Sequence, residues 1–262
     1  MTDSVLLDVT GSVATIILNR PDAMNSLTVE AKVALNEAVQ SVAADDRVRA
    51  LVLTGTGRAF CVGQDLREHA ALLEAGDPAP LATVHEHYNP LVTALAALPF
   101  PTIAALNGTA AGAGLGIACA LDLRIAAAGA RLTTAFAGIG LTADSGLSWT
   151  LPRLVGGGRA AALMLLSEPF TTEQALEMGL VNVVVPADQV LTVAQELAGR
   201  LAVGPTAAYA CIKESLRAGA AGSLVETLAK EDELQTRAGQ TSDHRNAVRS
   251  FLAKEQPVFE GR

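Results

Sequence analysis

The sequence predicts a mixed α/β fold in which short strands alternate with helices along one mid-sized chain. Half of the 262 residues are apolar and 18% are charged, which provides a buried core and is not the composition of a disordered chain. Only 3% are aromatic, so small aliphatic residues must fill that core. Short apolar runs bounded by glycine, proline and asparagine recur between stretches of helical spacing, which favours an α/β class over an all-helical one.

The N-terminal part is predicted to form a hairpin, a helix and a buried strand. Residues 5–9 and 14–18 are apolar runs joined across a Thr-Gly-Ser turn, as in a β-hairpin. Residues 28–44 have helical spacing and place five apolar residues on one face, namely Ala31, Leu35, Ala38, Val39 and Val42. Residues 50–53 predict a short buried strand, and the glycine- and proline-containing stretch 74–80 predicts a mobile loop.

The central stretch 91–121 contains no charged residue, and its length alone would allow a transmembrane helix. Several features speak against a membrane span. A helix over residues 84–98 must end at Pro99, and the Asn-Gly pair at 107–108 indicates a turn after a strand at 102–106. We therefore expect a buried helix, a strand and the start of another helix.

The C-terminal part is predicted to be helical from about Asp188 onward, after short strands at 123–126 and 181–185. A last helix over 242–254 ends before Pro257. Capping-box spacing occurs at Thr171 with Gln174 and at Ser223 with Glu226. Favourable i,i+4 charge pairs are predicted for Glu226 with Lys230 and for Glu233 with Arg237.

Charge, cysteine and histidine content exclude several function classes. The formal net charge is −8 and there is no basic run, so we expect no nucleic-acid partner. The three cysteines are isolated, and the four histidines lack the spacing of a zinc site, so we expect no metal. The odd cysteine count and the absence of a signal-peptide pattern predict a cytoplasmic protein.

Two glycine-centred segments, 60–67 and 107–116, are the candidate sites for chemistry. A helix that begins near Ala113 would direct free N–H groups and its positive dipole end toward an anion. The structural alternatives are an ordinary strand-to-helix loop with Asp65 as helix cap, and tight packing of small residues. Neither segment matches a Walker A loop or a complete dinucleotide fingerprint.

Taken together, the two segments resemble the crotonase (enoyl-CoA hydratase/isomerase) superfamily. The same resemblance extends over nearly the whole chain and is carried by Leu18-Asn19-Arg20-Pro21, Asn25-Ser26-Leu27, Gly138-Ile139-Gly140-Leu141, Leu151-Pro152-Arg153-Leu154-Val155-Gly156 and Gly179-Leu180-Val181. It implies a ββα spiral core over residues 1–195 that binds acyl-CoA. It also implies a C-terminal helical region, 196–262, through which the chain forms a homotrimer or a homohexamer.

The resemblance implies that the backbone N–H groups of Gln64 and Ala113 form an oxyanion hole for the thioester oxygen. The two catalytic glutamates of the hydratases align with Gly116 and Phe136, and neither of these can transfer a proton. Isomerase members place a single catalytic carboxylate at the position of Asp144. The structural alternative for Asp144 is the N-cap of a helical turn over 145–151.

Further segments resemble the 1,2-epoxyphenylacetyl-CoA isomerase branch of this superfamily, namely Gly63-Gln64-Asp65-Leu66, Tyr88-Asn89-Pro90-Leu91-Val92, Ala110-Ala111-Gly112-Ala113-Gly114 and Asp144-Ser145-Gly146. The branch usually has proline and glycine where Ala143 and Leu147 stand. The resemblance implies a substrate-binding set of Ala23, Met24, Ser26, Gly63, Asp65, Leu66, Arg67 and Gly112. Arg67 is suited to a CoA phosphate, and a surface role is an equal alternative.

The sequence therefore predicts an acyl-CoA isomerase that uses one carboxylate, either for a double-bond shift in enoyl-CoA or for epoxyphenylacetyl-CoA. The alternatives are an enoyl-CoA hydratase that uses Asp144 alone and a non-catalytic acyl-CoA-binding protein. The expected partner is an acyl-CoA thioester, and no cofactor is expected beyond the coenzyme A of the substrate.

Overall fold

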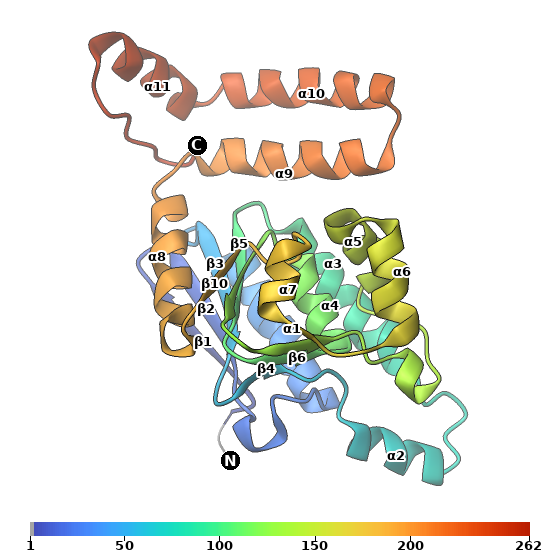
Figure 1. The fold of residues 1–262 in the computed structure, drawn as a ribbon. Helices are drawn as coiled ribbons and strands as arrows, with labels where there is room; N and C mark the ends of the chain where they lie inside the picture. Colours follow the sequence, from blue (N-terminus) through green and yellow to red (C-terminus); the bar gives the residue numbers. More distant parts are fainter. Residues whose placement is uncertain (1–2) are drawn as a thin grey trace.

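The computed structural model describes residues 3–262 and contains two sheets around which helices are wound (Figure 1). The larger sheet has 6 strands in the order β1-β2-β3-β5-β7-β10, and the smaller has 4 in the order β4-β6-β8-β9. The strands are β1 Val5–Thr10, β2 Val13–Leu18, β3 Ala50–Gly55, β4 Ala59–Cys61, β5 Thr102–Leu106, β6 Thr109–Ala111, β7 Leu123–Ala127, β8 Arg131–Thr133, β9 Phe170–Thr171 and β10 Val183–Val185. The α-helices are α1 Val29–Ala44, α2 Leu66–Glu74, α3 Asn89–Ala97, α4 Ala113–Ala120, α5 Leu147–Val155, α6 Gly157–Leu166, α7 Thr172–Glu177, α8 Val190–Ala202, α9 Thr206–Ala221, α10 Leu224–Gly239 and α11 Ser242–Ala253.

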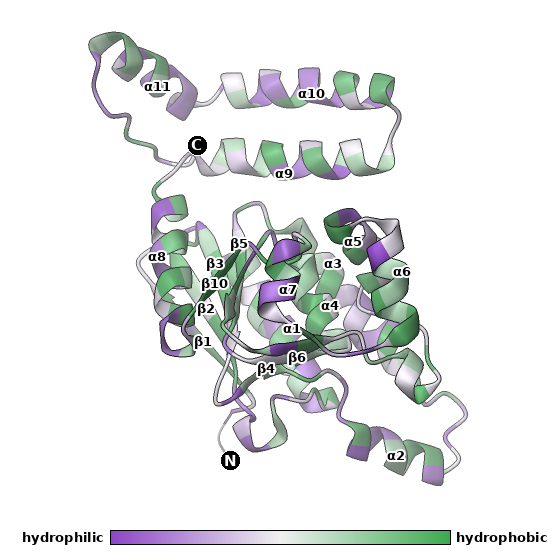
Figure 2. Cartoon of the chain, in the orientation of Figure 1, coloured by the Kyte–Doolittle hydropathy of each residue, from purple (hydrophilic) through white to green (hydrophobic). Residues whose placement is uncertain are grey.

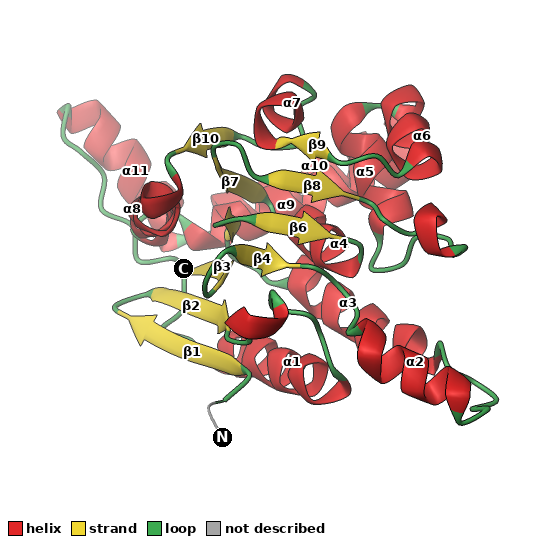
Figure 3. Cartoon of the chain, turned by 60° about the horizontal axis from the view of Figure 1, so that its bottom comes forward, coloured by secondary structure: helices red, strands yellow, loops and turns green. Residues whose placement is uncertain are grey.

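The chain climbs through the two sheets as a spiral. The consecutive strand pairs β3/β4, β5/β6 and β7/β8 each place the first strand in the larger sheet and the second in the smaller one. A helix follows each pair before the next turn begins. Within both sheets the strands of successive turns lie parallel, and Figure 3 shows β4, β6 and β8 side by side. The predicted ββα spiral is therefore confirmed.

The predicted hairpin and first helix are also confirmed. β1 and β2 pair in antiparallel register from Val5–Leu18 to Thr10–Val13. The hydroxyl of Thr28 caps α1 by accepting a hydrogen bond from the Ala31 N–H. The five apolar residues assigned to one face of this helix are all buried, but they share that face with a charged residue, Lys32.

The central strands β3 and β5 of the larger sheet are buried on both faces. Alternate residues of β3 point to opposite sides, so Leu51 and Leu53 join the main core while Ala50 and Val52 face α8. Small residues of α8 complete this second core, and Figure 2 shows the strands between the two layers as apolar. The boundary predicted after residue 195 lies within α8, and this helix packs on the sheet.

The helices α9, α10 and α11 extend beyond the two sheets, and α9 packs along α10 (Figure 1). α9 also contacts the core, since the Lys213 ammonium donates to the Phe100 carbonyl. Both predicted capping boxes are present, at the starts of α7 and α10. The predicted i,i+4 pairs are wrong. Lys230 pairs with Glu214 of α9 at 2.7 Å and with Glu233 at 2.9 Å, and Arg237 pairs with Glu214. The nearby α9 helix supplies a carboxylate that both cations share, whereas Glu226 is occupied in its own capping box.

The charge-free central stretch divides into α3, β5, β6 and α4, and within residues 3–262 no helix is long and apolar enough to cross a membrane. The helix predicted over 84–98 begins instead with a π-helical turn, Val84–Tyr88, before α3. The strand predicted at 181–185 starts two residues later, because the N–H of Val181 bonds to the carbonyl of Ala175.

Candidate active site

A largely apolar cavity of about 120 Å³ opens between the smaller sheet, α2 and the loop before α5. A cavity of this order accepts a single benzene-sized group, since apolar cavities near 150 Å³ bind benzene. Its polar lining includes Gln64, Thr83, Tyr88 and Asp144. The remaining wall consists of Val62, Leu66, His69, Leu81, Val84, Gly112, Ala113, Ala135, Phe136, Ile139 and Leu141.

The two glycine-centred segments meet at one edge of this cavity. β4 and β6 are parallel neighbours, so the residues that follow them emerge at the same end of the smaller sheet. Gly63 has a φ of +84°, and a Cβ atom there would lie 3.0 Å from the Ala111 carbonyl oxygen and 3.1 Å from the Ala113 nitrogen. Only glycine combines this backbone conformation with such a close approach.

The N–H groups of Gln64 and Ala113 have no acceptor within residues 3–262. Ala113 opens α4, where the first N–H groups of a helix lack intrahelical partners. The Gln64 peptide is held on both sides, because the Leu27 N–H donates to Gly63 O at 2.8 Å and the Asp65 N–H donates to Leu27 O at 3.1 Å. Two free donors thus belong to residues that line one cavity, as an oxyanion requires.

The carboxyl group of Asp144 belongs to a residue of the same cavity wall. The alternative role as helix cap is wrong, because α5 begins at Leu147 with Gly146 as its N-cap and has no side-chain cap. The Ser145 hydroxyl donates to Asp144 Oδ1 at 2.8 Å. Burial raises the pKa of Asp144, while this hydrogen bond and the charge of Lys32 oppose the rise. Such a carboxyl group is suited to both accept and return a proton.

The two positions at which the resemblance places the hydratase glutamates hold Gly116 and Phe136 and carry no acid. Phe136 contributes its ring to the cavity wall. A Cβ atom on Gly116 would lie 2.7 Å from the Cβ of Ser145, so the loop that carries Asp144 packs directly on α4. This loop occupies the space that a longer side chain at position 116 would need.

The structure adds a residue to the site that the sequence analysis missed. The Lys32 ammonium donates to Gln64 Oε1 at 2.9 Å and to Thr83 Oγ1, and the Tyr88 hydroxyl donates to the same Gln64 oxygen at 2.8 Å. The signal was available, because Lys32 falls in helical register with Leu35 and Val39 on the buried face of α1.

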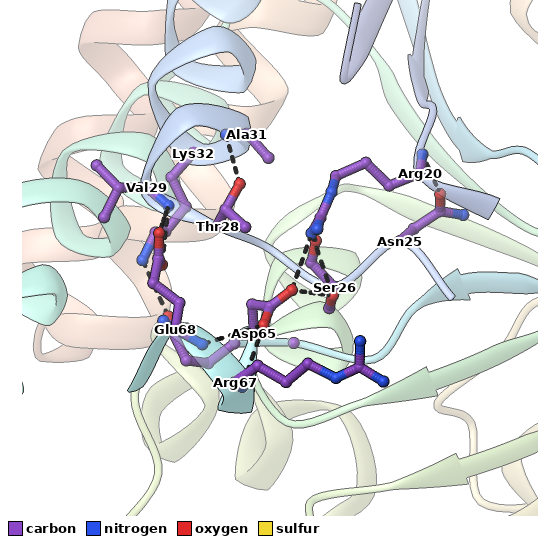
Figure 4. A network of polar contacts seen from close by, with 12 residues as sticks. Arg20, Asn25, Ser26, Thr28, Val29, Ala31, Lys32, Asp65, Arg67 and Glu68 are labelled. Carbon is purple, nitrogen blue, oxygen red and sulfur yellow. Dashed lines mark hydrogen bonds and ion pairs between the residues drawn. The ribbon is translucent and has the colours of Figure 1, made fainter. Parts of the chain in front are cut away.

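Several predicted substrate-binding residues belong to a polar network beside the cavity (Figure 4). Asp65 Oδ2 accepts from Ser26 Oγ at 2.8 Å and from Arg20 at 3.1 Å. Asp65 Oδ1 caps α2 by accepting from the N–H groups of Arg67 and Glu68, so the structural alternative for this residue is present. Burial raises the pKa of Asp65, but these hydrogen bonds and the Arg20 charge outweigh it and lower the pKa.

The predicted set therefore divides in two. Leu66 and Gly112 belong to the cavity wall together with the oxyanion-hole pair and Asp144. Ala23, Met24, Ser26, Gly63, Asp65 and Arg67 do not belong to that wall, and they lie in a 3-10 turn, in the loops beside it and in the first turn of α2. Met24 has a left-handed backbone with φ 51°, which is uncommon for a residue other than glycine. Among residues 3–262, no three histidine, cysteine or acidic side chains are grouped as metal ligands would be.

Comparisons with known proteins agree with this geometry. A family model described as enoyl-CoA hydratase/isomerase matches residues 8–262. The 1,2-epoxyphenylacetyl-CoA isomerase of Escherichia coli K12 is 41% identical over 264 residues, which is 100% of both chains. A Rhodobacter capsulatus protein named as an enoyl-CoA hydratase is 41% identical over 99% of this chain and 98% of its own. A crystal structure described as an enoyl-CoA hydratase/isomerase from Mycobacterium abscessus superposes with a TM-score of 0.95 at 46% identity, covering 98% of this chain and 100% of that one.

Proposed function

Because the chain belongs to the enoyl-CoA hydratase/isomerase family and has the crotonase fold, we propose that it is an acyl-CoA isomerase with Asp144 as its base. The proposal rests on the identity of the residues that line one cavity. Gln64, Ala113 and Asp144 line it together, while positions 116 and 136 hold glycine and phenylalanine. The site thus combines two free backbone donors with a single proton-transfer group.

In the proposed reaction, the thioester oxygen accepts hydrogen bonds from the N–H groups of Gln64 and Ala113. Asp144 takes a proton from the α- or γ-carbon, and the electron pair of that C–H bond moves toward the thioester oxygen to give an enolate. Each donor of such a hole stabilises the transition state by about 3–4 kcal/mol. Asp144 then returns its proton to another carbon, so the product is an isomer. This cycle needs no cofactor beyond the coenzyme A of the substrate.

The proposed substrate is an enoyl-CoA or an epoxyphenylacetyl-CoA. The Escherichia coli relative acts on 1,2-epoxyphenylacetyl-CoA, and the cavity has the volume and apolar wall that a ring-sized acyl group needs. We further propose that Ala23, Met24 and Arg67 hold the coenzyme A moiety outside the cavity, where Arg67 is exposed in the first turn of α2 and free to meet a phosphate.

The proposal is tested by comparing the wild type with Asp144→Asn on both substrate types. Isomerisation is expected in the wild type and a loss of at least about 100-fold in Asp144→Asn, because general acid-base groups contribute about that factor. Asp188→Asn is the matched control, since Asp188 is an exposed carboxylate remote from the cavity. Unchanged turnover in Asp144→Asn contradicts the assigned role. Tight acyl-CoA binding without any turnover would favour a non-catalytic acyl-CoA-binding protein instead.

A second candidate is an enoyl-CoA hydratase, because a relative of equal identity bears that name. In this reaction Asp144 alone would activate a water molecule for addition to the double bond. Turnover in water labelled with oxygen-18 separates the two reactions. A product that carries the label identifies a hydratase, whereas an unlabelled product of shifted double bond identifies an isomerase.

We also propose that the helices α9, α10 and α11 join copies of the chain into a homotrimer or homohexamer. Large apolar side chains are exposed along them, namely Ile212, Leu216, Leu224, Val225, Leu228, Phe251 and Leu252. An exposed apolar surface of this kind is typical of protein interfaces. Light scattering of the purified chain measures the assembly, and a monomer at micromolar concentration would contradict it.

A further inference from the structure

Two of the four lysines in this chain are buried, and they are held in different ways. Lys213 has a carboxylate partner, with its Nζ 2.6 Å from Asp122 Oδ2. Lys32 is 1% exposed and forms no ion pair within residues 3–262. A buried ammonium without a direct carboxylate partner is uncommon, because burial penalises the charge. Ion pairing therefore does not explain why Lys32 is buried.

The contacts of Lys32 join three residues of the active-site wall. Its Nζ donates to Gln64 Oε1 at 2.9 Å and to Thr83 Oγ1, and it lies 5.1 Å from the centre of the Tyr88 ring, as in a cation–π contact. The Tyr88 hydroxyl completes the group by donating to Gln64 Oε1. Gln64, Thr83 and Tyr88 all line the cavity, whereas Lys32 stands behind them.

This arrangement constrains the peptide that carries one oxyanion donor. The backbone of Gln64 is already held through Leu27, whose N–H donates to Gly63 O and whose carbonyl accepts from the Asp65 N–H. The Gln64 side-chain oxygen receives two hydrogen bonds, one from Lys32 and one from Tyr88, and these anchor the side chain of the same residue. A donor held in place before the substrate arrives needs no reorganisation during the reaction.

The positive charge of Lys32 also affects the pKa of Asp144, the proposed base. The charge of Lys32 opposes the rise that burial causes in the pKa of Asp144, and Asp144 in turn opposes the lowering of the pKa of Lys32 by its own burial. Other ionisable and polar groups surround Lys32 and Asp144. Glu68 and His69 belong to α2, and Asp65 caps that helix. Tyr88 belongs to the π-helical turn, Cys61 to β4 and Ser145 to the loop before α5. His87 Nδ1 lies 3.2 Å from Thr83 Oγ1 and is one contact further away.

We propose that Lys32 is a positioning residue, which holds the Gln64 peptide N–H in the oxyanion hole and places a positive charge behind the wall to which Asp144 belongs. The inference rests on the proposed isomerase function. Lys32 acts through Gln64 and Asp144 and does not touch the substrate.

The central variant is Lys32→Met, which keeps a long unbranched side chain and removes the charge. We expect kcat to fall by about 10- to 100-fold, with little change in KM, because the loss is one of positioning. The acid limb of the kcat/KM profile is expected to move to higher pH by up to about one unit, since Asp144 loses a nearby positive charge. The melting temperature is expected to stay the same or rise, because a buried charge has been removed.

Three further variants separate the two effects. Lys32→Arg keeps the charge, so the acid limb should stay in place even where repacking lowers kcat. Gln64→Met keeps the backbone N–H and removes the anchored oxygen, so kcat should fall while the acid limb stays in place. Lys254→Met is the matched control for a lost lysine charge, because Lys254 is exposed at the end of α11, and wild-type kinetics are expected.

Wild-type kcat and an unshifted acid limb in Lys32→Met would overturn the inference. If Lys32→Met fails to fold, Gln64→Met and Lys32→Arg give the same test in chains that keep a buried positive charge, and wild-type kcat in Gln64→Met would then overturn the inference. Carbon-13 NMR of the Asp144 carboxyl group provides a measurement without turnover. If the wild type isomerises no acyl-CoA, the proposed function fails. The charge effect on Asp144 is then still supported or overturned by whether this resonance titrates at higher pH in Lys32→Met.

Discussion

Gly116 of α4 and Ser145 of the loop before α5 are in such close contact that a Cβ atom on Gly116 would lie 2.7 Å from the Cβ and 3.1 Å from the carbonyl oxygen of Ser145. Ser145 itself has a left-handed backbone with φ 52°. The neighbouring residue is Asp144, so the position of the proposed base depends on the absence of a side chain at Gly116. Any side chain at position 116 would therefore shift the loop that carries Asp144.

The first prediction concerns this contact. Gly116→Ala is expected to destabilise the fold by about 1–3 kcal/mol, as overpacking of a core does, and to lower isomerase activity by displacing Asp144. Gly116→Glu is expected to lose isomerase activity without gaining hydratase activity. Gly199→Ala is the control, because this helical glycine of α8 has open space around it, and the change should raise stability through helix propensity. Denaturant unfolding and both assays provide the measurements, and a hydratase gain in Gly116→Glu would contradict the packing argument.

The second prediction tests the close approach at the oxyanion hole. Gly63→Ala is expected to destabilise the chain by about 1–3 kcal/mol and to lower kcat, because the added carbon strains a positive φ and pushes against Ala111 and Ala113. Gly76→Ala is the matched control, since its φ of +67° is equally left-handed but nothing lies within 4 Å of the added carbon. Equal kinetic effects of the two changes would refute a specific role for the contact.

The third prediction links Asp144 to pH and stability. Burial raises its pKa above the usual value of 3.8, so the folded state holds this proton more tightly than the unfolded state does. The resulting stability is present at low pH and is lost as the pH rises through the folded pKa. Asp144→Asn carries no such charge, so its stability relative to the wild type should increase with pH over that window. Unfolding free energies measured from pH 4 to pH 8 check the sign, and a constant difference would contradict it.

The fourth prediction contrasts the second buried lysine with Lys32. Lys213 donates to Asp122 Oδ2 and to the Phe100 carbonyl, which ties α9 to the core. Lys213→Met is expected to destabilise the chain by about 1–3 kcal/mol, because Asp122 is left without its cation in a partly buried place. The acid limb of the kcat/KM profile of Lys213→Met should lie at the same pH as in the wild type. Thermal unfolding and the pH profile distinguish this structural lysine from Lys32. A shifted acid limb in Lys213→Met would contradict a purely structural role for Lys213.

Much of the fold was accessible from the sequence because it depends on local patterns. The spacing of apolar residues predicted the β1–β2 hairpin and α1, and both capping boxes form as their spacing indicates. The charge pairs on α10 were predicted wrongly, because their partners come from a neighbouring helix that a single helix pattern does not contain. The π-helical turn before α3 escaped prediction for a similar reason, since its Tyr88 is held by Gln64 from another part of the chain.

For the active site, the sequence by itself determined which residues are present: the two glycine-centred segments, Asp144, and the lack of an acid at positions 116 and 136. Only the tertiary structure decided what surrounds them. It placed the Gln64 and Ala113 donors at one cavity, released Asp144 from a capping role, and brought Lys32 behind the wall. The physical reason is that composition and periodicity act within a segment, whereas burial and charge at a site arise from segments that folding brings together.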